Sequence, residues 1–178
     1  MLHCFLRFLS YKPSAFSYKG CLIYMDPITV NNGPVRDIII GSDHGGFDLK
    51  EECRLFLSKK SGYRVFDQGV YDSQSSDYPE IAKKVALAVL KGDYEKGILI
   101  CGSGIGMSIT ANRFKGIRAA LCHDLFTARL SRQHNDANIL VMGGRVIGTG
   151  IAIEMVEIFL NTEFEDGRHR KRINLIDC

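Results

Sequence analysis

The sequence predicts an α/β protein: a three-layer αβα sandwich built on a five-stranded, parallel, doubly wound sheet of the Rossmann-like kind. Two observations lead to this expectation. From residue 36 onward, short apolar runs alternate five times with longer segments of helical periodicity. The connections are short, and two are rich in glycine, as is typical of the turns that follow strands in such sheets. Residues 36–178 are therefore expected to form a single domain, and residues 1–35 an N-terminal extension with little stable structure.

The first two strand–helix units follow from simple patterns. Residues 36–42, RDIIIGS, are a β-branched run followed by glycine, which predicts a buried strand. Residues 47–60 carry apolar side chains at near-helical spacing and are expected to form the helix that follows. A second short strand is expected at residues 63–66. The second helix is expected at residues 78–90, where Pro79 suits the first turn and apolar residues share one side.

Three further units complete the expected sheet. The strands are expected at residues 97–101, 117–122 and 137–142, and the helices at residues 104–114, 124–134 and 148–160. The strand segments GILIC, IRAALC and ANILVM are short and apolar, as strands covered on both faces should be. Ligands of such sheets bind at the carboxyl ends of the strands, so chemistry is expected just after residues 42, 101, 122 and 142.

Composition and charge exclude several classes of partner. Hydrophobic residues make up 46% of the chain and charged residues 24%, which is ordinary for a globular protein. No uninterrupted apolar run approaches about 18 residues, so a membrane partner is not expected. Three of the 23 basic residues lie in residues 1–24, which hold no acidic residue, so the remaining chain carries 20 charges of each sign. A neutral body gives no electrostatic footprint for nucleic acid.

Cysteine usage and the first residues bear on the compartment. The six cysteines form no CxxC pair and no Cys/His cluster with zinc spacing, so no metal is expected. Scattered cysteines of this kind are typical of reduced thiols, and we expect a cytoplasmic protein. Residues 1–24 are basic, aromatic-rich and acid-free. They are interpreted as an extension without a targeting role, with a transit-like leader as the alternative.

The glycine-rich loop GSDHGG, residues 41–46, lies between the first strand and the first helix. Its backbone allows close approach of a ligand, and amides at a helix start attract anions. His44 suits contact with a phosphate, and Asp43 suits orientation of a hydroxyl or transfer of a proton. The alternative is a tight turn in which Asp43 caps the helix. The loop is not a Walker A motif, because Phe47 stands where lysine is required.

A second such loop, CGSGIGM at residues 101–107, follows the third strand. Several of its N–H groups are expected to face one concavity and to hold an oxyanion. Cys101 lies beside the start of a helix, a position that favours the thiolate, which is a nucleophile or a base. The alternative is a buried structural cysteine. The spacing GxGxG does not match a dinucleotide fingerprint. Met107 also stands where, by resemblance, cysteine phosphatases need arginine.

Two later segments supply further polar candidates. His134 lies near the expected end of a helix, where the helix dipole stabilises its cation and suits it to act as a general acid; an ordinary helix end is the alternative. The tail segment GRHRKR, residues 167–172, carries five consecutive cationic or potentially cationic side chains. If it is helical, Arg168 and Arg172 share one face and suit phosphate capture. A solvated charge run is the alternative.

Together these segments resemble ribose-5-phosphate isomerase type B, in the family that also includes the galactose-6-phosphate isomerase subunits. The resemblance covers about residues 36–175 and excludes the N-terminal extension. It is carried, in order, by GSDHGG, Asp77-Tyr78-Pro79, CGSGIGMSITANRFKGIRAA, LSRQHNDANILVMGGRVIG and EDGRHRKR. Several motifs in one order are far more specific than any single loop.

The resemblance implies catalytic roles. Cys101 would move the proton between C1 and C2 of the sugar, and Met107 supports this version because some relatives carry a glutamate at its position. Ser103 would help a proton pass between the sugar oxygens. His134, assisted by Asp43, would open the furanose ring.

The resemblance also implies binding roles. Backbone amides in the glycine loop would stabilise the enediolate oxygen, namely those of Gly102, Ser103, Gly104, Ile105 and Gly106. His44, Arg168 and Arg172 would hold the phosphate. Asn135 and Arg145 would complete the site, and Tyr78 would line it. A homodimer or a pair of dimers is implied, with the sites at the subunit interface.

The expected activity is the interconversion of ribose 5-phosphate and ribulose 5-phosphate, with neither metal nor organic cofactor. A six-carbon substrate, allose or galactose 6-phosphate, is an alternative. The depth of the pocket decides how many carbon atoms the sugar can have, and the sequence does not give that depth. A non-catalytic phosphosugar-binding protein on the same fold is a second alternative. The joint presence of Cys101, Asp43 and His134 argues against it, since a non-catalytic binding protein needs only the residues that bind the phosphate.

Overall fold

A computed structural model of the chain describes residues 16–18, 21–23 and 35–176. The chain divides into two compact units, Met1–Asn32 and Gly33–Cys178. In the first unit, strands β1 (Phe16–Tyr18) and β2 (Cys21–Ile23) pair in the antiparallel direction. The expectation of little stable structure in residues 1–35 mostly concerns residues outside this description and stays a prediction.

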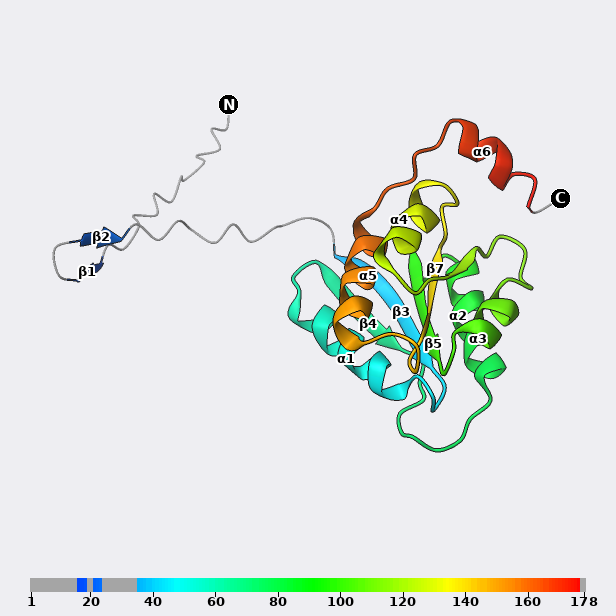
Figure 1. Ribbon diagram of the computed structural model, residues 1–178, viewed down its shortest axis with the longest axis horizontal. Helices are drawn as coiled ribbons and strands as arrows, with labels where there is room; N and C mark the ends of the chain where they lie inside the picture. The colour runs from blue at the N-terminus through cyan, green and yellow to red at the C-terminus, as the bar shows by residue number, and fades with distance from the viewer. Residues whose placement is uncertain (1–15, 19–20, 24–34, 177–178) are drawn as a thin grey trace, which may run out of the picture. The chain divides into compact units, whose positions relative to one another are not determined.

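The second unit contains the expected five-stranded parallel sheet (Figure 1). Its strands are β3 (Arg36–Ser42), β4 (Tyr63–Asp67), β5 (Lys96–Cys101), β6 (Ala119–Leu121) and β7 (Ile139–Gly143). Their order is β4-β3-β5-β7-β6, and every neighbouring pair is parallel. The chain moves from β3 outward to β4 and then returns to the other side of β3. The topological switch point therefore lies between β3 and β5.

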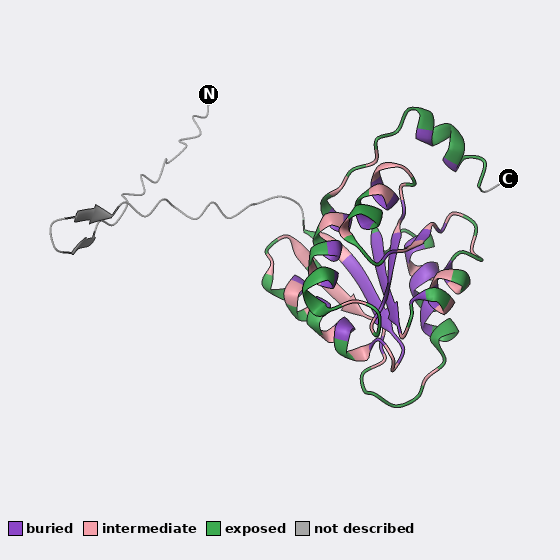
Figure 2. Ribbon diagram, in the orientation of Figure 1, coloured by how far each residue is buried: buried purple, intermediate pink, exposed green. Residues whose placement is uncertain are grey.

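The helices cover both faces of this sheet. They are α1 (Phe47–Lys59), α2 (Tyr78–Leu90), α3 (Ile105–Ala111), α4 (Leu125–Gln133), α5 (Thr149–Asn161) and α6 (Arg168–Ile173). One apolar core joins α1, α4 and α5 to the sheet, and a second joins α2 and α3 to the other face. Successive residues of β3 alternate between the cores: Ile38 and Ile40 belong to the first, Ile39 to the second. Figure 2 shows the sheet as the most buried layer. The predicted three-layer architecture is confirmed.

Two predicted strands begin too early. The strand expected from residue 117 begins at Ala119, because the N–H of Ile117 closes a turn onto Phe114 and that of Arg118 donates to the side chain of Asn138. The strand expected from residue 137 begins at Ile139, because the N–H of Ala137 donates to the carbonyl of Ser131. All three amides are used in turn and loop contacts, so they are not available to the sheet.

The predicted helix over residues 104–114 is also too long. Helix α3 ends at Ala111, and the side-chain amide of Asn112 then pairs with Ala119, donating to its carbonyl at 2.9 Å and accepting from its N–H at 2.8 Å. This pairing draws the chain out of the helix and toward β6. In the residues that the structure describes, no helix is long and apolar enough to cross a membrane.

The parallel sheet has two distinct edges. We call the edge where the strands end, including Cys101 and Gly143, the carboxyl edge, and the opposite one the amino edge. Register pairs Gly97 with Ile139 and Cys101 with Gly143, so four residues separate the edges along these strands. At a rise of about 3.3 Å per residue, the edges are about 13 Å apart.

Candidate active site

A pocket opens at the carboxyl edge, at the switch point between β3 and β5. Its volume is about 410 Å³, and it is lined by Asp43, Tyr78, Cys101, Gly102, Ser103, Gly106, Arg145 and Val146. Seven of these eight residues are among those singled out in the sequence; Val146 is the addition. The two glycine-rich loops therefore lie together, as expected for loops that follow neighbouring strands of a parallel sheet.

Cys101 ends β5, and its side chain is turned into the following loop. The residue is 5% exposed, and its Sγ accepts a hydrogen bond from the N–H of Gly104 at 3.1 Å. Gly104 has φ of 80°, a left-handed conformation that favours glycine and brings its N–H back onto the sulfur. The sulfur thus lies at the wall of the pocket in contact with a main-chain N–H donor.

Two other described cysteines differ from Cys101. Cys53 and Cys122 are buried in the core on the opposite face of the sheet. Burial raises the pKa of the Cys53 thiol to about 12, and burial also raises the pKa of Cys122. Both therefore stay protonated and inert at neutral pH.

The amides of the CGSGIGM loop are partly engaged within the loop itself. The N–H of Gly104 donates to the sulfur of Cys101, and the N–H of Ile105 donates to the Oγ of Ser103 at 3.4 Å. An oxyanion that binds to these two amides would have to compete with those acceptors. The hydroxyl of Ser103 lies on an exposed residue of the pocket wall, within reach of a ligand.

Asp43 closes a turn ahead of α1, whose N-cap residue is Gly46 and not Asp43. Its Oδ1 accepts the N–H of Gly46 at 3.0 Å and so closes the turn before α1, while the side chain also lines the pocket. His44 is tied to the loop that precedes α2: its N–H donates to the Oγ of Ser76, and its Nδ1 accepts the N–H of Ser76 at 3.2 Å. A neutral His44 therefore carries its proton on Nε2 and can donate from there.

Tyr78 and Arg145 close the pocket from two sides. A Cβ at Gly106 would lie 2.6 Å from the ring of Tyr78, so only glycine at that position lets the ring pack so closely. The N–H of Arg145 donates to the carbonyl of Gly102 at 3.0 Å. The turn that carries Arg145 is thereby fastened to the loop that follows Cys101.

A second group of predicted residues gathers at the amino edge instead. His134 and Asn135 follow α4, and a pocket of about 390 Å³ is lined by His134, Asn135, His169, Arg172, Ile173 and Ile176. The tail carrying Arg168 and Arg172 forms a helix, α6. A helix is the condition under which these two arginines, four residues apart, share one face. The N–H of Glu165 donates to the carbonyl of Gln133, which holds the segment before α6 against the end of α4.

The loop that carries His134 and Asn135 is held by a charged network. Asp136 has φ of 45°, which is costly for a residue other than glycine. Its carboxylate accepts from Arg118 at 3.1 Å and from the buried Arg132 at 2.9 Å. The Nε of Arg118 also donates to the carbonyl of Asn135. These contacts offset the backbone strain and fix the direction of the loop.

His169 differs from the arginines beside it. The sequence counted it within a cationic run, but its side chain is 6% exposed and its ring stacks on that of His134, with centroids 4.2 Å apart and planes 7° from parallel. Burial, and then the positive charges of His134, Arg168 and Arg172, lower the pKa of His169, while Glu165 acts against this. His169 is therefore a neutral, packed residue at neutral pH. The sequence identified His169 only as potentially cationic, because spacing alone does not reveal burial.

Within the described residues, one group of side chains has the composition of a metal site. Donor atoms of His134, Glu165 and His169 all lie within 4.8 Å of one another. An imidazole nitrogen presents its lone pair in the plane of the ring, however, and these two planes are stacked and nearly parallel. One ion cannot lie in both planes, so the arrangement does not suit the binding of a metal by both histidines.

The predicted site is thus divided between the two edges of one chain. Asp43, Tyr78, Cys101, the glycine loop and Arg145 lie at the carboxyl edge. His134, Asn135, Arg168 and Arg172 lie at the amino edge, about 13 Å away along the strands. Sequence reasoning missed Ser76 and Glu165, because their contacts depend on segments that meet only in the folded chain.

Known proteins are similar to this chain over most of its length. The model of a protein family described as Ribose/Galactose Isomerase matches residues 38–176. Ribose-5-phosphate isomerase B from Escherichia coli is 46% identical over 142 residues, which cover 80% of this chain and 95% of that protein. A 4-deoxy-4-sulfo-D-erythrose isomerase from a Clostridium species is 45% identical over 130 residues, covering 72% of this chain and 81% of that protein.

The fold is equally similar to solved structures. A crystal structure of a ribose 5-phosphate isomerase from Thermotoga maritima superimposes with a TM-score of 0.78 at 51% identity. The match covers 80% of this chain and 97% of that one. The family model, which matches residues 38–176, covers both groups of candidate residues.

Proposed function

Since the chain belongs to the ribose/galactose isomerase family and is a sugar phosphate isomerase, we propose that it interconverts ribose 5-phosphate and ribulose 5-phosphate. The observation that carries the proposal is the position of the Cys101 sulfur, at the wall of a pocket and beside a glycine loop. Isomerisation needs a base next to an oxyanion stabiliser, because the proton beside a carbonyl is only weakly acidic.

The proposed reaction proceeds through an enediolate. The Cys101 thiolate takes the proton from C2 of the open-chain aldose, the C1–C2 double bond forms, and the electrons of the carbonyl pass to O1. Amides of the loop stabilise the negative oxygen, and the Ser103 hydroxyl helps to pass a proton from O2 to O1. The thiol then returns its proton to C1, which gives the ketose and restores the thiolate. Atoms and charge balance without an added reagent.

We further propose that each complete site forms between two copies of the chain. The division of the predicted residues between opposite edges supports this, since Cys101 lies at the carboxyl edge, His134 lies at the amino edge, and the two edges are about 13 Å apart. Exposed apolar side chains also support it. Ile105 and Ile109, one turn apart on α3, are 53% and 56% exposed beside the first pocket. A homodimer that buries them would bring the amino edge of one copy to the carboxyl edge of the other.

In this arrangement Arg168 and Arg172 would hold the phosphate, with Nε2 of His44 donating from the other copy. Guanidinium groups suit this role because they bind oxyanions through paired N–H donors. Anchoring the phosphate would orient the reacting carbons over the sulfur.

The number of carbon atoms in the substrate is proposed from the names of the relatives. The relatives from Escherichia coli and Thermotoga maritima are named for ribose 5-phosphate, which favours a five-carbon sugar here. A six-carbon sugar phosphate remains the alternative. The relative named for a four-carbon sulfo sugar supports a site that binds tetrahedral anions in general rather than phosphate alone.

A substrate panel in heavy water tests the proposal. The wild-type protein is incubated with ribose 5-phosphate, allose 6-phosphate, galactose 6-phosphate or 4-deoxy-4-sulfo-erythrose, and NMR follows ketose formation and deuterium at the reacting carbons. We expect the highest kcat/KM with ribose 5-phosphate and loss of exchange in Cys101→Ala. A higher kcat/KM with a six-carbon sugar would refute the pentose assignment. Binding without exchange for every sugar would support a sensor.

A further inference from the structure

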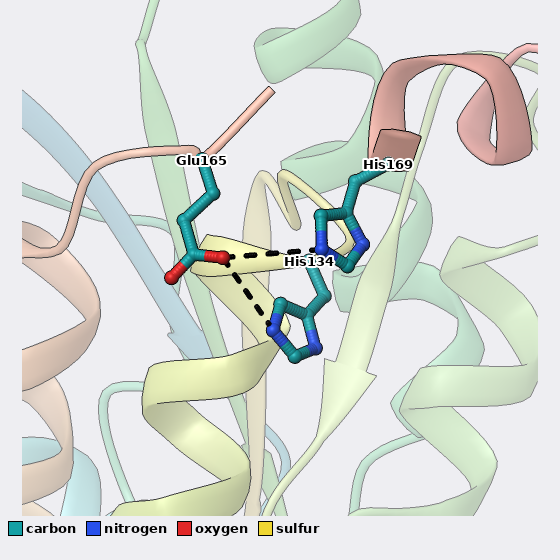
Figure 3. Close-up of side chains that lie close together, drawn as sticks. All are labelled: His134, Glu165 and His169. Carbon is teal, nitrogen blue, oxygen red and sulfur yellow. Dashed lines mark ion pairs between the residues drawn. The ribbon is translucent and has the colours of Figure 1, made fainter. Parts of the chain in front are cut away.

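The ring of His134 is held from two directions by residues that the proposed reaction does not use. One face of the ring lies on His169, whose plane is only 7° from parallel. Beside the ring, Oε2 of Glu165 lies 3.7 Å from Nε2 of His134 and 3.9 Å from Nε2 of His169 (Figure 3). The three side chains come from the end of α4, from the segment before α6 and from α6 itself. Three segments of the chain therefore meet at one imidazole.

The hydrogen bond to His169 determines where its proton lies. The Nε of Arg168 donates to Nε2 of His169 at 3.3 Å, so this nitrogen presents a lone pair. A guanidinium has no lone pair to offer, so the direction of this bond is unambiguous. The remaining nitrogen, Nδ1, then carries the proton of a neutral ring. The lowered pKa of His169 agrees with this neutral form.

The two nitrogens of His134 have different surroundings. Nε2 faces the carboxylate of Glu165, which favours a proton on that nitrogen. Nδ1 lies on the side of the ring away from Glu165 (Figure 3). The residue is only partly buried and lines the pocket of the amino edge. Nδ1 is thus the nitrogen left for a ligand.

We propose that Glu165 and His169 are positioning residues that act through His134. They fix the plane of its ring and make Nδ1 the nitrogen that exchanges a proton with the sugar when the furanose ring opens. The inference rests on the proposed function, since it assigns a step to His134. In that step Nδ1 gives a proton to the ring oxygen as the C1–O4 bond breaks. The hydroxyl proton of C1 passes to Asp43 of the other copy, and the aldehyde forms.

The charges around the pair suit this role. The groups that face the two rings are the carboxylate of Glu165, from the segment before α6, and the guanidinium groups of Arg168 and Arg172, from α6. The negative charge of Glu165 compensates the positive charge of one imidazolium. Two stacked imidazolium ions beside two arginines would repel one another. With His169 neutral, His134 alone carries the mobile proton. A neutral aromatic ring beneath a cationic one also stabilises it.

The chemistry of the two substrates gives a selective test. Ribose 5-phosphate is mostly a closed furanose, so its turnover needs ring opening. Ribulose 5-phosphate cannot close such a ring, because its O5 carries the phosphate. Exchange of its C1 proton with heavy water therefore reports on Cys101 chemistry without ring opening. A residue that acts only through His134 should affect the first readout far more than the second.

The variants are Glu165→Gln, His169→Ala and His169→Phe, with Glu163→Gln as the matched control because Glu163 is exposed and two residues away. We expect kcat/KM for ribose 5-phosphate to fall about 10- to 100-fold in Glu165→Gln and His169→Ala, as is usual when support of a functional histidine is lost. Exchange from ribulose 5-phosphate should stay within about threefold. His169→Phe keeps the stack and should recover part of the loss.

Three outcomes separate this inference from the function on which it rests. Equal loss of both readouts in His169→Ala, or no loss of either, would overturn the inference. A fall in Glu163→Gln as large as that in Glu165→Gln would overturn the role of Glu165. If His134→Asn itself shows no selective loss with ribose 5-phosphate, the role proposed for His134 fails instead. Thermal unfolding of each variant confirms that the fold is retained.

Discussion

The sulfur of Cys101 accepts a hydrogen bond from the backbone N–H of Gly104, 3.1 Å away, in a turn that only the left-handed conformation of Gly104 allows. The contact joins the end of the central strand β5 to the start of α3. It places a nucleophilic atom and main-chain amides on one wall of a pocket.

Replacing Cys101 by alanine or serine should remove proton transfer and leave binding intact. We expect kcat to fall by at least about 10³-fold, because the step then has no base of suitable strength. Calorimetric titration with a non-reactive phosphosugar analogue should give a Kd within about threefold of wild type. Cys122→Ala is the matched control, since that thiol is buried away from the pocket. Near-normal turnover in Cys101→Ser would remove the residue from catalysis.

Two inactive variants should regain activity when they are mixed, if each active site takes residues from two copies of the chain. Cys101→Ala and His134→Asn are each expected to be inactive with ribose 5-phosphate. A mixed dimer holds one site with both wild-type residues and one site with neither. After the two proteins are unfolded together and refolded, activity should rise to about a quarter of wild type, since about half of the dimers are mixed. Failure of the mixture to recover activity, with mixed dimers verified by mass spectrometry, would contradict shared sites.

The arginines of α6 should act mainly on binding. Arg172→Ala removes a guanidinium from the wall of the amino-edge pocket, and we expect KM to rise about 10- to 100-fold, the range for a lost hydrogen bond to a charged group. Arg168→Ala should show a similar rise. Arg170→Ala is the control on the same helix, because Arg170 pairs with Asp166 and lines neither pocket. Initial-rate measurements that give an unchanged KM for Arg172→Ala would exclude it from the phosphate site.

A buried lysine should be important for stability rather than activity. The Lys50 side chain is fully buried, and its Nζ contacts Asp67 at 2.5 Å and the carbonyl of Val70 at 2.8 Å. Lys50→Met leaves that carboxylate without its cation, so we expect the free energy of unfolding to fall by about 2–4 kcal/mol. The double variant Lys50→Met/Asp67→Asn should recover part of the loss. Urea unfolding measures both, with exposed Lys84→Met expected to change stability by less than about 0.5 kcal/mol.

The packed histidine should make stability depend on pH. Burial and neighbouring positive charges lower the pKa of His169 below its ordinary 6.5, so the unfolded chain binds a proton more readily than the folded one. Stability from this group is therefore present above pH 6.5 and is lost as the pH falls toward the folded pKa. The drop in Tm between about pH 7 and about pH 5 should be smaller in His169→Phe than in the wild type. An equal drop would show that another group titrates.

The sequence predicted the architecture well because its signals are local. Five apolar runs and their helices identify a doubly wound sheet, and β3 and α2 begin and end at the predicted residues. The errors lie where distant segments compete for backbone groups. Asn112 ends α3 early by pairing with Ala119, and Asn138 takes the amide of Arg118 from the sheet. Local patterns carry no information on such partners.

The carboxyl-edge half of the candidate site was predictable for the same reason. Asp43 follows β3 and Cys101 ends the neighbouring strand β5, so topology alone brings their loops into one pocket. The surroundings of His134 were not predictable in this way. Glu165 and His169 meet it only because α6 returns across the end of α4, and no spacing in the sequence reports that packing.

The sequence by itself thus determined the order of the elements, the two glycine-rich loops and the kinds of side chain available for chemistry. These depend on periodicity and on residue type, which are properties of short segments of the sequence. Only the tertiary structure decided that the candidate residues separate onto opposite edges of one sheet. It also decided that the histidine in the cationic tail is buried, stacked and neutral. Both properties depend on distances between segments far apart in sequence, which the folded core alone fixes.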